Sequence, residues 1–145
     1  EIPVQIYNEE MNIQDGSLMP TSDEEWRKVL DPDAYRVLRE KSTEAPFTGA
    51  YVDLKEDGFY HCKACNAKLF MSDDKFDSGT GWPSFTKALE GAVGTRTDES
   101  HGMQRTETFC TNCGGHLGHL FGDGPKDKGG KRFCINSCAL DFEER

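Results

Sequence analysis

The 145-residue sequence contains no apolar run that approaches the roughly 20 residues of a membrane-spanning helix. It is also poor in positive charge, because 17 Lys and Arg residues stand against 26 Asp and Glu residues and give a formal net charge of −9. No internal repeat and no low-complexity segment is present. These features argue against membrane-spanning helices, and against nucleic acids and anionic membranes as partners.

What is present fits a globular protein. Hydrophobic residues make up 35% of the chain and charged residues 30%, a balance unlike that of disordered chains. The length suits one domain and allows a core to form without a framework of disulfides.

The six cysteines could form three disulfides in a secreted protein, but their spacing favours another use. Cys62 and Cys65 form one C-x-x-C pair, and Cys110 and Cys113 form a second. Two such pairs in one small domain are typical of a tetrahedral zinc site with four thiolate ligands. Because four protein ligands leave no open position, the predicted zinc is structural. Two structural disulfides remain the alternative.

The N-terminal part of the chain predicts an arm and two helices. Residues 1–21 are polar, lack a clear period and form the predicted arm. Ser22 followed by Glu25 has the pattern of a capped helix start, and Asp31 followed by Pro32 has the pattern of a second. The residues expected to be buried on these helices are Trp26, Val29, Leu30, Tyr35, Val37 and Leu38.

After Pro46 the pattern changes to that of strands. Residues 50–54 and 59–62 flank a turn signal at residues 56–58, which predicts a hairpin. Further strands are predicted over residues 68–71, 91–97, 103–109 and 132–140. The expected fold is therefore mainly β, with short N-terminal helices and an antiparallel β core, in a domain over residues 22–145.

Two segments concentrate residues suited to a binding site. Trp82, beside Pro83 and close to two glycines, could present a flat ring at a cleft, or could pin a loop as a core residue. His116 and His119 directly follow the second C-x-x-C pair and could supply protons near neutral pH. A second metal at these histidines lacks an obvious third ligand.

The remaining cysteines, Cys134 and Cys138, are the ones with possible chemistry. If residues 132–136 form a strand, Arg132, Cys134 and Asn136 point to one face. Arg132 would then lower the pKa of the Cys134 thiol from about 8.5, and Asn136 could orient a substrate or a water. This arrangement predicts a reactive thiol at Cys134, with an inert buried cysteine as the alternative.

Taken together, these motifs resemble the methionine sulfoxide reductase B family over residues 22–143. The matching motifs are the two C-x-x-C pairs, Ser78-Gly79-Thr80-Gly81-Trp82-Pro83-Ser84-Phe85, Gly102-Met103-Gln104-Arg105-Thr106-Glu107, His116-Leu117-Gly118-His119-Leu120-Phe121, Asp123-Gly124-Pro125 and Arg132-Phe133-Cys134-Ile135-Asn136-Ser137. The resemblance implies two antiparallel sheets that form a distorted barrel or sandwich, with the zinc at the end opposite the active site.

The resemblance also implies a role for each polar site residue. Cys134 matches the nucleophile that attacks the sulfoxide sulfur and becomes a sulfenic acid as methionine leaves. His116 and His119 match residues that bind substrate and manage protons. Arg132 matches the cation that activates the thiol, and Asn136 matches a residue that orients the site.

Aromatic residues complete the implied site. Trp82 matches the wall that receives the methyl group of the sulfoxide, and an apolar ring suits a methyl group on a polarizable sulfur. Phe85 and Phe121 are predicted beside it as further substrate-binding residues.

The sequence departs from the commonest family pattern at Thr80, where many members carry a resolving cysteine. Cys138 is the remaining candidate. If residues 134–138 are extended they span roughly 13 Å, which exceeds the Cα separation of about 7 Å that a disulfide allows. The prediction is that Cys138 is mainly structural and that an external thiol, such as thioredoxin or glutathione, attacks the sulfenic acid.

The implied enzyme is a peptide-methionine (R)-S-oxide reductase that repairs oxidised proteins. The implied substrate is methionine sulfoxide in proteins, with free methionine sulfoxide as the alternative. Free thiols suit a reducing compartment, so the expected location is the cytoplasm, although the sequence begins at Glu1 rather than Met and a targeting segment removed ahead of it stays open. The alternative is a zinc-stapled module that binds a ligand beside Trp82 without catalysis.

Overall fold

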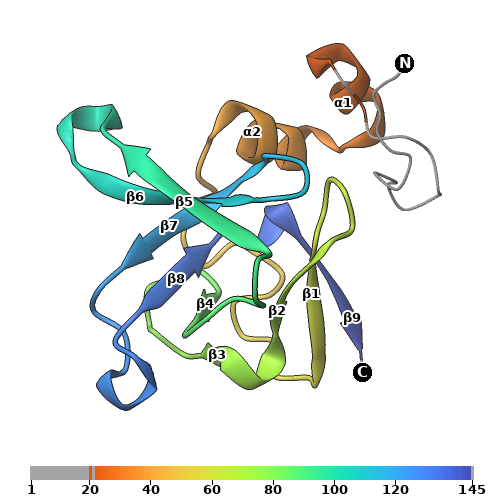
Figure 1. Ribbon diagram of the computed structural model, residues 1–145. Helices are drawn as coiled ribbons and strands as arrows, with labels where there is room; N and C mark the ends of the chain where they lie inside the picture. Colours follow the sequence, from red (N-terminus) through yellow and green to blue (C-terminus); the bar gives the residue numbers. More distant parts are fainter. Residues whose placement is uncertain (1–19, 21, 145) are drawn as a thin grey trace.

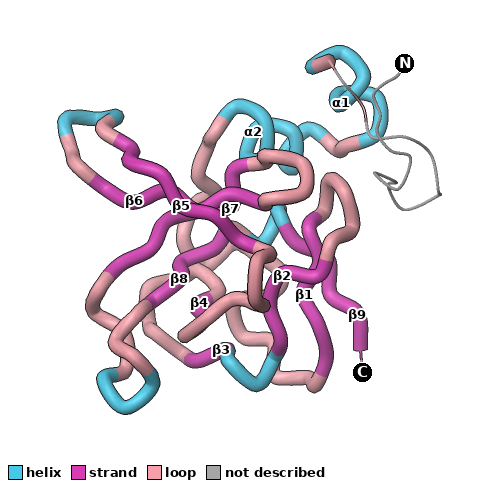
Figure 2. Tube along the Cα trace, in the orientation of Figure 1, coloured by secondary structure: helices cyan, strands magenta, loops and turns pink. Residues whose placement is uncertain are grey.

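The computed structural model describes residue 20 and residues 22–144, so the predicted arm lies outside the described residues apart from Pro20. Two α-helices come first in the described chain, and two antiparallel sheets follow (Figures 1 and 2). The predicted mainly β class with short N-terminal helices is therefore confirmed.

The two helices begin where their capping residues predict. They are α1 (Asp23–Val29) and α2 (Pro32–Glu40). The Ser22 hydroxyl accepts the N–H of Glu25 at 3.2 Å, and the Asp31 carboxylate accepts the N–H of Ala34 at 2.8 Å. Val29 was expected to be buried but is 54% exposed, whereas the other residues predicted for the buried faces are buried. Neither helix in the described part of the chain has the length and apolar character needed to cross a bilayer.

The strands form one small and one larger sheet, and all the pairs are antiparallel. Their bounds are β1 (Gly58–Cys62), β2 (Lys68–Met71), β3 (Lys75–Phe76), β4 (Ser84–Phe85), β5 (Val93–Asp98), β6 (Arg105–Cys110), β7 (His116–Phe121), β8 (Arg132–Ile135) and β9 (Leu140–Glu144). The three-stranded sheet has the order β2-β1-β9, and the six-stranded sheet has the order β3-β4-β8-β7-β6-β5 (Figure 1).

The predicted hairpin between residues 50–54 and 59–62 is wrong. Residues 50–54 form turns and bends, and β1 pairs with β2 and β9 instead. The physical reason is visible in the carbonyl groups of Val52 and Leu54, which each accept a hydrogen bond from Lys75 Nζ at 3.0 Å. A side-chain ammonium thus takes the place that a strand partner would have.

The single strand predicted over residues 132–140 is also wrong. The chain leaves β8 after Ile135, passes through a 3-10 turn at Ser137–Ala139, and enters β9 at Leu140. Because β8 belongs to the six-stranded sheet and β9 to the three-stranded sheet, this turn is where the chain changes sheets. The segment that follows the second cysteine pair, β7, is a strand that the sequence pattern did not predict.

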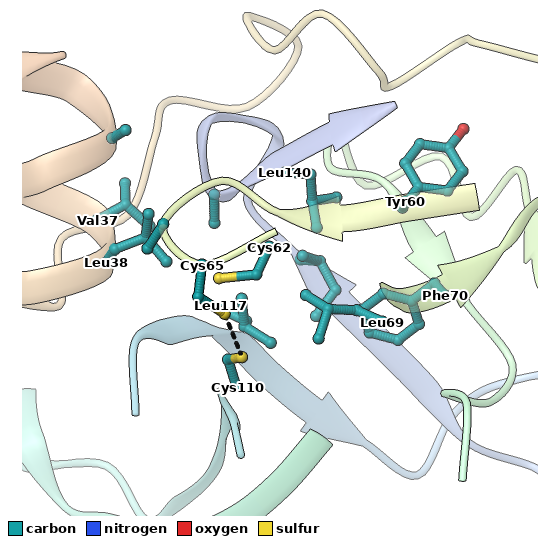
Figure 3. Packing of buried hydrophobic residues seen from close by; sticks show 14 of the residues in the cluster. Val37, Leu38, Tyr60, Cys62, Cys65, Leu69, Phe70, Cys110, Leu117 and Leu140 are labelled. Atoms are coloured by element: carbon teal, nitrogen blue, oxygen red, sulfur yellow. Dashed lines mark hydrogen bonds between the residues drawn. The ribbon is translucent and has the colours of Figure 1, made fainter. Parts of the chain in front are cut away.

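Side chains from both sheets and from α2 share one buried cluster (Figure 3). Phe70 and Phe85 stack with ring centroids 4.3 Å apart, and Tyr60 meets Phe85 edge to face at 5.1 Å. On the helical side, Val37 and Leu38 reach the cluster as α2 packs against β7. This packing fixes β7 and β8, the two strands that carry most of the predicted site.

Candidate active site and metal centre

A cleft of about 150 Å³ gathers residues from the six-stranded sheet, from the loop before β4 and from the segment after α2. Its lining consists of Thr43, Thr80, Trp82, Arg105, Gly118, His119, Phe121, Arg132, Cys134 and Asn136. Most of the residues that the sequence singled out for chemistry or substrate binding are therefore together in one place. The exceptions are His116, Phe85 and Cys138.

Cys134 lies in the middle of this arrangement. It is part of β8, opposite Ser84 of β4 on one side and His119 of β7 on the other. β7 and β8 approach closely here: a Cβ atom on Gly118 would lie only 1.9 Å from the carbonyl oxygen of Cys134. Only glycine fits at position 118, and its absence of a side chain keeps the Cys134 backbone against β7.

Burial raises the pKa of the Cys134 thiol above its ordinary value, and this effect outweighs Arg132 and Thr80, which both lower it. Arg132 therefore lowers the pKa of Cys134 as predicted, but burial outweighs it, so the net pKa lies above the usual value. The Arg132 side chain also contacts two other groups. Its Nε lies 2.8 Å from Asp123 Oδ1, and its guanidinium carbon lies 4.5 Å from the ring centre of Phe121. Its charge reduces, but does not cancel, the cost of ionising a buried thiol.

Replacing Arg132 with glutamine is expected to slow alkylation of Cys134 by iodoacetamide about tenfold at pH 7.5. The lost charge lets the pKa of Cys134 rise further and leaves less of the reactive thiolate at this pH. The two rates should converge at high pH, where both thiols are ionised. Mass spectrometry of the Cys134 peptide against time and pH measures this.

Arg36→Gln is the control, since this guanidinium pairs with Asp33 on the exposed face of α2. An equal loss of rate at every pH in Arg132→Gln would contradict the electrostatic role and indicate a change of access instead.

His119 is held in place by a buried carboxylate. Its Nε2 lies 2.7 Å from Asp98 Oδ2, and Arg105 Nη2 lies 3.5 Å from the same oxygen. The hydrogen bond with His119 and the N–H of Ser100 keep the pKa of Asp98 well below its usual range. Asp98 is therefore ionised at neutral pH and engages Nε2, so His119 has Nδ1 available for exchanging a proton with a bound molecule.

His116 lies behind the cleft rather than on its wall. It is buried, its ring centre is 5.4 Å from that of His119, and its Nδ1 lies 2.8 Å from Glu107 Oε2. Glu107 is fully buried and also receives Arg96 Nε at 3.0 Å and Lys41 Nζ at 3.1 Å. Burial lowers the pKa of His116 despite this carboxylate. The expectation that His116 touches substrate does not fit a residue outside the cleft lining.

Asn136 lines the cleft, but its amide is already bonded to the backbone on two sides. Its Nδ2 donates to the carbonyl oxygen of Leu117 at 2.9 Å, and its Oδ1 accepts the N–H of Glu44 at 2.9 Å. Asn136 thereby ties the end of β8 to β7 and to the segment after α2. Its geometry suits a residue that positions the cleft wall.

Glu44 was not identified from the sequence, yet it forms hydrogen bonds with four residues of the site. They are Trp82, Asn136, Ser137 and Cys138. Its carbonyl oxygen accepts the indole N–H of Trp82 at 3.0 Å. Its carboxylate accepts the N–H groups of Ser137 at 2.8 Å and Cys138 at 3.0 Å, at the start of the 3-10 turn. No local motif marks this residue, because its four hydrogen-bond partners all lie far away in the sequence.

Thr80 and Cys138, the two positions relevant to a resolving thiol, lie in different environments. Thr80 lines the cleft, and its hydroxyl bonds at 2.8 Å to Ser78 Oγ, which bonds at 2.7 Å to Ser84 Oγ. Cys138 lines a separate cavity of about 810 Å³. Burial and Glu44 raise the pKa of Cys138 to about 12.

The prediction that Phe85 binds substrate is wrong. Phe85 is fully buried, stacks on Phe70 and is absent from the cleft lining. In the antiparallel register, Phe85 faces Phe133 while its neighbour Ser84 faces Cys134, so alternation along β4 directs Phe85 into the core. Phe121, the other predicted phenylalanine, does line the cleft.

The four cysteines of the C-x-x-C pairs form one cluster, as their spacing predicts. Their sulfur atoms all lie within 4.8 Å of one another. Cys62 Sγ is 3.7 Å from Cys113 Sγ. Cys65 Sγ is 3.6 Å from Cys110 Sγ (Figure 3). A tetrahedron of sulfurs about 2.3 Å from a zinc ion has edges of about 3.8 Å, so the donor set fits zinc.

The two cysteine pairs are held by matching backbone turns. The N–H of Asn66 donates to the carbonyl oxygen of Cys62 at 2.8 Å, and the N–H of Gly114 donates to that of Cys110 at 2.7 Å. Asn66 and Gly114 both have positive φ, 68° and 77°, a conformation that asparagine and glycine tolerate best. One turn follows the end of β1 and the other follows the end of β6, so a bound ion would link the two sheets.

Comparison with known proteins agrees with this arrangement. Residues 30–144 match the family model described as the SelR domain. The chain is 53% identical over 124 residues to the peptide methionine sulfoxide reductase MsrB of Leptospira interrogans, covering 85% of this chain and 94% of the relative. It is 54% identical over 127 residues to the protein of that name from Thiobacillus denitrificans, covering 87% and 96%. The chain therefore belongs to the SelR-domain family of MsrB-type peptide methionine sulfoxide reductases.

Proposed function

We propose that this protein reduces the R epimer of methionine sulfoxide in oxidised proteins, with Cys134 as the nucleophile and an external thiol as the final reductant. The observation that carries the proposal is the cleft that brings Cys134, Trp82 and His119 together. Family membership supports the reduction of methionine sulfoxide itself. The epimer, the order of steps and the reductant are inferences from the site and from the family resemblance.

In the first step the Cys134 thiolate attacks the sulfur of the sulfoxide. This attack joins the two sulfurs while the protonated oxygen leaves the methionine sulfur as water. Water then adds to the Cys134 sulfur, the sulfur–sulfur bond breaks, and methionine leaves as a thioether with a sulfenic acid on Cys134. Two electrons pass from the cysteine sulfur to the methionine sulfur. An oxide is a poor leaving group, so the oxygen must be protonated, and the imidazolium form of His119, with Asp98 on Nε2, carries the needed proton on Nδ1.

The other residues of the site would support this reaction by holding the substrate and by positioning the reacting groups. The Trp82 ring, fixed through its indole N–H by Glu44, offers an apolar wall to the methyl group. The Arg132 charge favours the thiolate that attacks. We assign His116 and Asn136 to positioning: His116 through its contact with His119, and Asn136 through its bonds to the backbone.

We infer that an external thiol, such as that of thioredoxin or glutathione, attacks the sulfenic acid directly. That step forms a mixed disulfide on Cys134 and releases water, and a second thiol then restores the Cys134 thiol and leaves as a disulfide. Thr80 cannot resolve the intermediate because it has no sulfur. Cys138 is poorly suited because it lines a different cavity and its raised pKa of about 12 keeps it protonated.

We assign one structural zinc ion to the four clustered cysteines. Such an ion would hold the ends of β1 and β6 together and would take no part in the redox chemistry, because four thiolates leave it no open position. Use of free thiols fits a reducing compartment such as the cytoplasm. We further propose that residues 22–145 act as one catalytic domain.

The proposed specificity is tested by giving the purified protein the separate R and S sulfoxides of a blocked methionine, with dithiothreitol or thioredoxin as reductant. We expect turnover of the R epimer at least about 100-fold faster than that of the S epimer, since a cleft with the methyl wall, the thiol and the proton donor at fixed places fits one chirality. Chromatography of the methionine formed gives both rates. Equal rates, or preference for the S epimer, would contradict the proposal.

A further inference from the structure

Phe47 is the most exposed of the large hydrophobic residues in the described part of the chain, with 71% of its surface accessible. Its backbone φ of 65° lies in the left-handed region, which is costly for a residue with a bulky side chain. In the free protein the exposed ring buries little apolar surface, so little stabilisation offsets the strain in its backbone. Backbone strain of this kind is typical of functional sites, where a contact with another molecule can offset it.

The position of Phe47 is fixed by the loop that forms one wall of the cleft. Its N–H donates to the carbonyl oxygen of Gly81 at 2.8 Å. A Cβ atom on Gly81 would lie 2.7 Å from Pro46 Cβ and 2.9 Å from the Phe47 ring, so the phenylalanine rests directly on the glycine. The residues on either side of Gly81, Thr80 and Trp82, both line the cleft. Phe47 is therefore at the rim of the cleft, one residue away from its wall.

The size of the cleft explains why the rim matters. Its volume of about 150 Å³ is below the roughly 300–1,000 Å³ of pockets that enclose drug-sized ligands, so it suits a single side chain. When a methionine sulfoxide inside a protein enters it, the neighbouring residues of that protein must stay outside, at the rim. A free methionine sulfoxide has no such neighbours.

We propose that Phe47 packs against an apolar side chain next to the oxidised methionine and so favours polypeptide substrates in which aliphatic or aromatic residues flank the sulfoxide. This inference rests on the proposed function and adds to it a specificity-determining residue for the substrate. The interaction is an apolar contact made outside the cleft, and it involves neither Cys134 nor the proton donor.

The test compares three substrates that carry the R sulfoxide: a blocked methionine, a peptide with leucine on both sides of the sulfoxide, and the same peptide with serine in place of leucine. For Phe47→Ala we expect kcat/KM to fall about fivefold to tenfold on the leucine peptide and to stay within twofold on the other two. Phe47→Tyr, which keeps the ring, should retain the preference for leucine. Val29→Ala, which removes an exposed apolar group from α1, is the matched control and should behave like the unmodified protein.

Phe47→Gly guards against an effect of loop distortion, because glycine adopts the left-handed backbone without strain. It should lose the preference for leucine and keep full activity on the blocked substrate. An equal loss on all three substrates, or no loss on the leucine peptide, would overturn the inference. If the unmodified protein reduces neither sulfoxide epimer of blocked methionine, the proposed function itself fails, and the two failures are thus distinguishable.

Discussion

Cys134→Ser is expected to lower the reduction of methionine sulfoxide by at least about 1,000-fold, even with a large excess of dithiothreitol. A serine hydroxyl is a far weaker nucleophile than a thiolate and cannot form a sulfenic acid. The change removes a single sulfur from a partly exposed position, so the melting temperature should stay within a few degrees of that of the unmodified protein. Chromatography of methionine formed from the R sulfoxide measures the loss.

Cys138→Ser is the matched control, because it removes the other thiol that lies outside the metal cluster. We expect it to keep turnover supported by thioredoxin. Retained activity in Cys134→Ser would refute the nucleophile. Loss of thioredoxin-supported turnover in Cys138→Ser, with one equivalent still reduced, would instead show that Cys138 resolves the intermediate.

Cys110→Ser is expected to remove the bound zinc and to lower the melting temperature by at least about 12 °C. Structural zinc in small domains contributes apparent free energies of about 10 kcal/mol, and even a loss of about 4 kcal/mol shifts the melting temperature of a domain this size by roughly 12 °C. The fold gives a further reason, since the cluster joins the end of β1 in one sheet to the end of β6 in the other. Elemental analysis and thermal unfolding measure the two effects.

The unmodified protein and Cys138→Ser should both hold about one zinc ion per chain, and a strong chelator should lower their melting temperatures toward that of Cys110→Ser. A protein without zinc that is fully stable would contradict the metal assignment. A mass about 4 Da below that of the reduced chain would indicate two disulfides instead.

Local signals in the sequence were sufficient for the helices but not for the path between the sheets. Ser22 and Asp31 cap their helices through bonds to residues three positions away, so the information is contained in a few neighbouring residues. The break after Ile135 has another origin, because β8 and β9 belong to different sheets and the chain must turn to reach the second. A run of strand-forming residues carries no information about which sheet will accept them.

For the site, the sequence placed Cys134 and Arg132 correctly on the same cleft, since alternation along a strand determines which side chains share a face. It could not give the pKa of the thiol, which depends on burial by segments far away in the chain. The same limit applies to Asp98 and Glu44, whose partners are distant in sequence and meet them only in the folded protein. The prediction that Phe85 binds substrate failed because the sequence does not show which face of β4 is turned toward the cleft.

The chemical state of Cys134 after one turnover tests the proposed mechanism most directly. Reduced protein is mixed with excess R sulfoxide, without any other reductant, in the presence of dimedone, which reacts with sulfenic acids. We predict one methionine formed per chain and one dimedone adduct, located on the peptide that contains Cys134. A disulfide between Cys134 and Cys138 in place of the adduct would contradict regeneration by an external thiol, and methionine formed without any change at Cys134 would contradict the nucleophile itself.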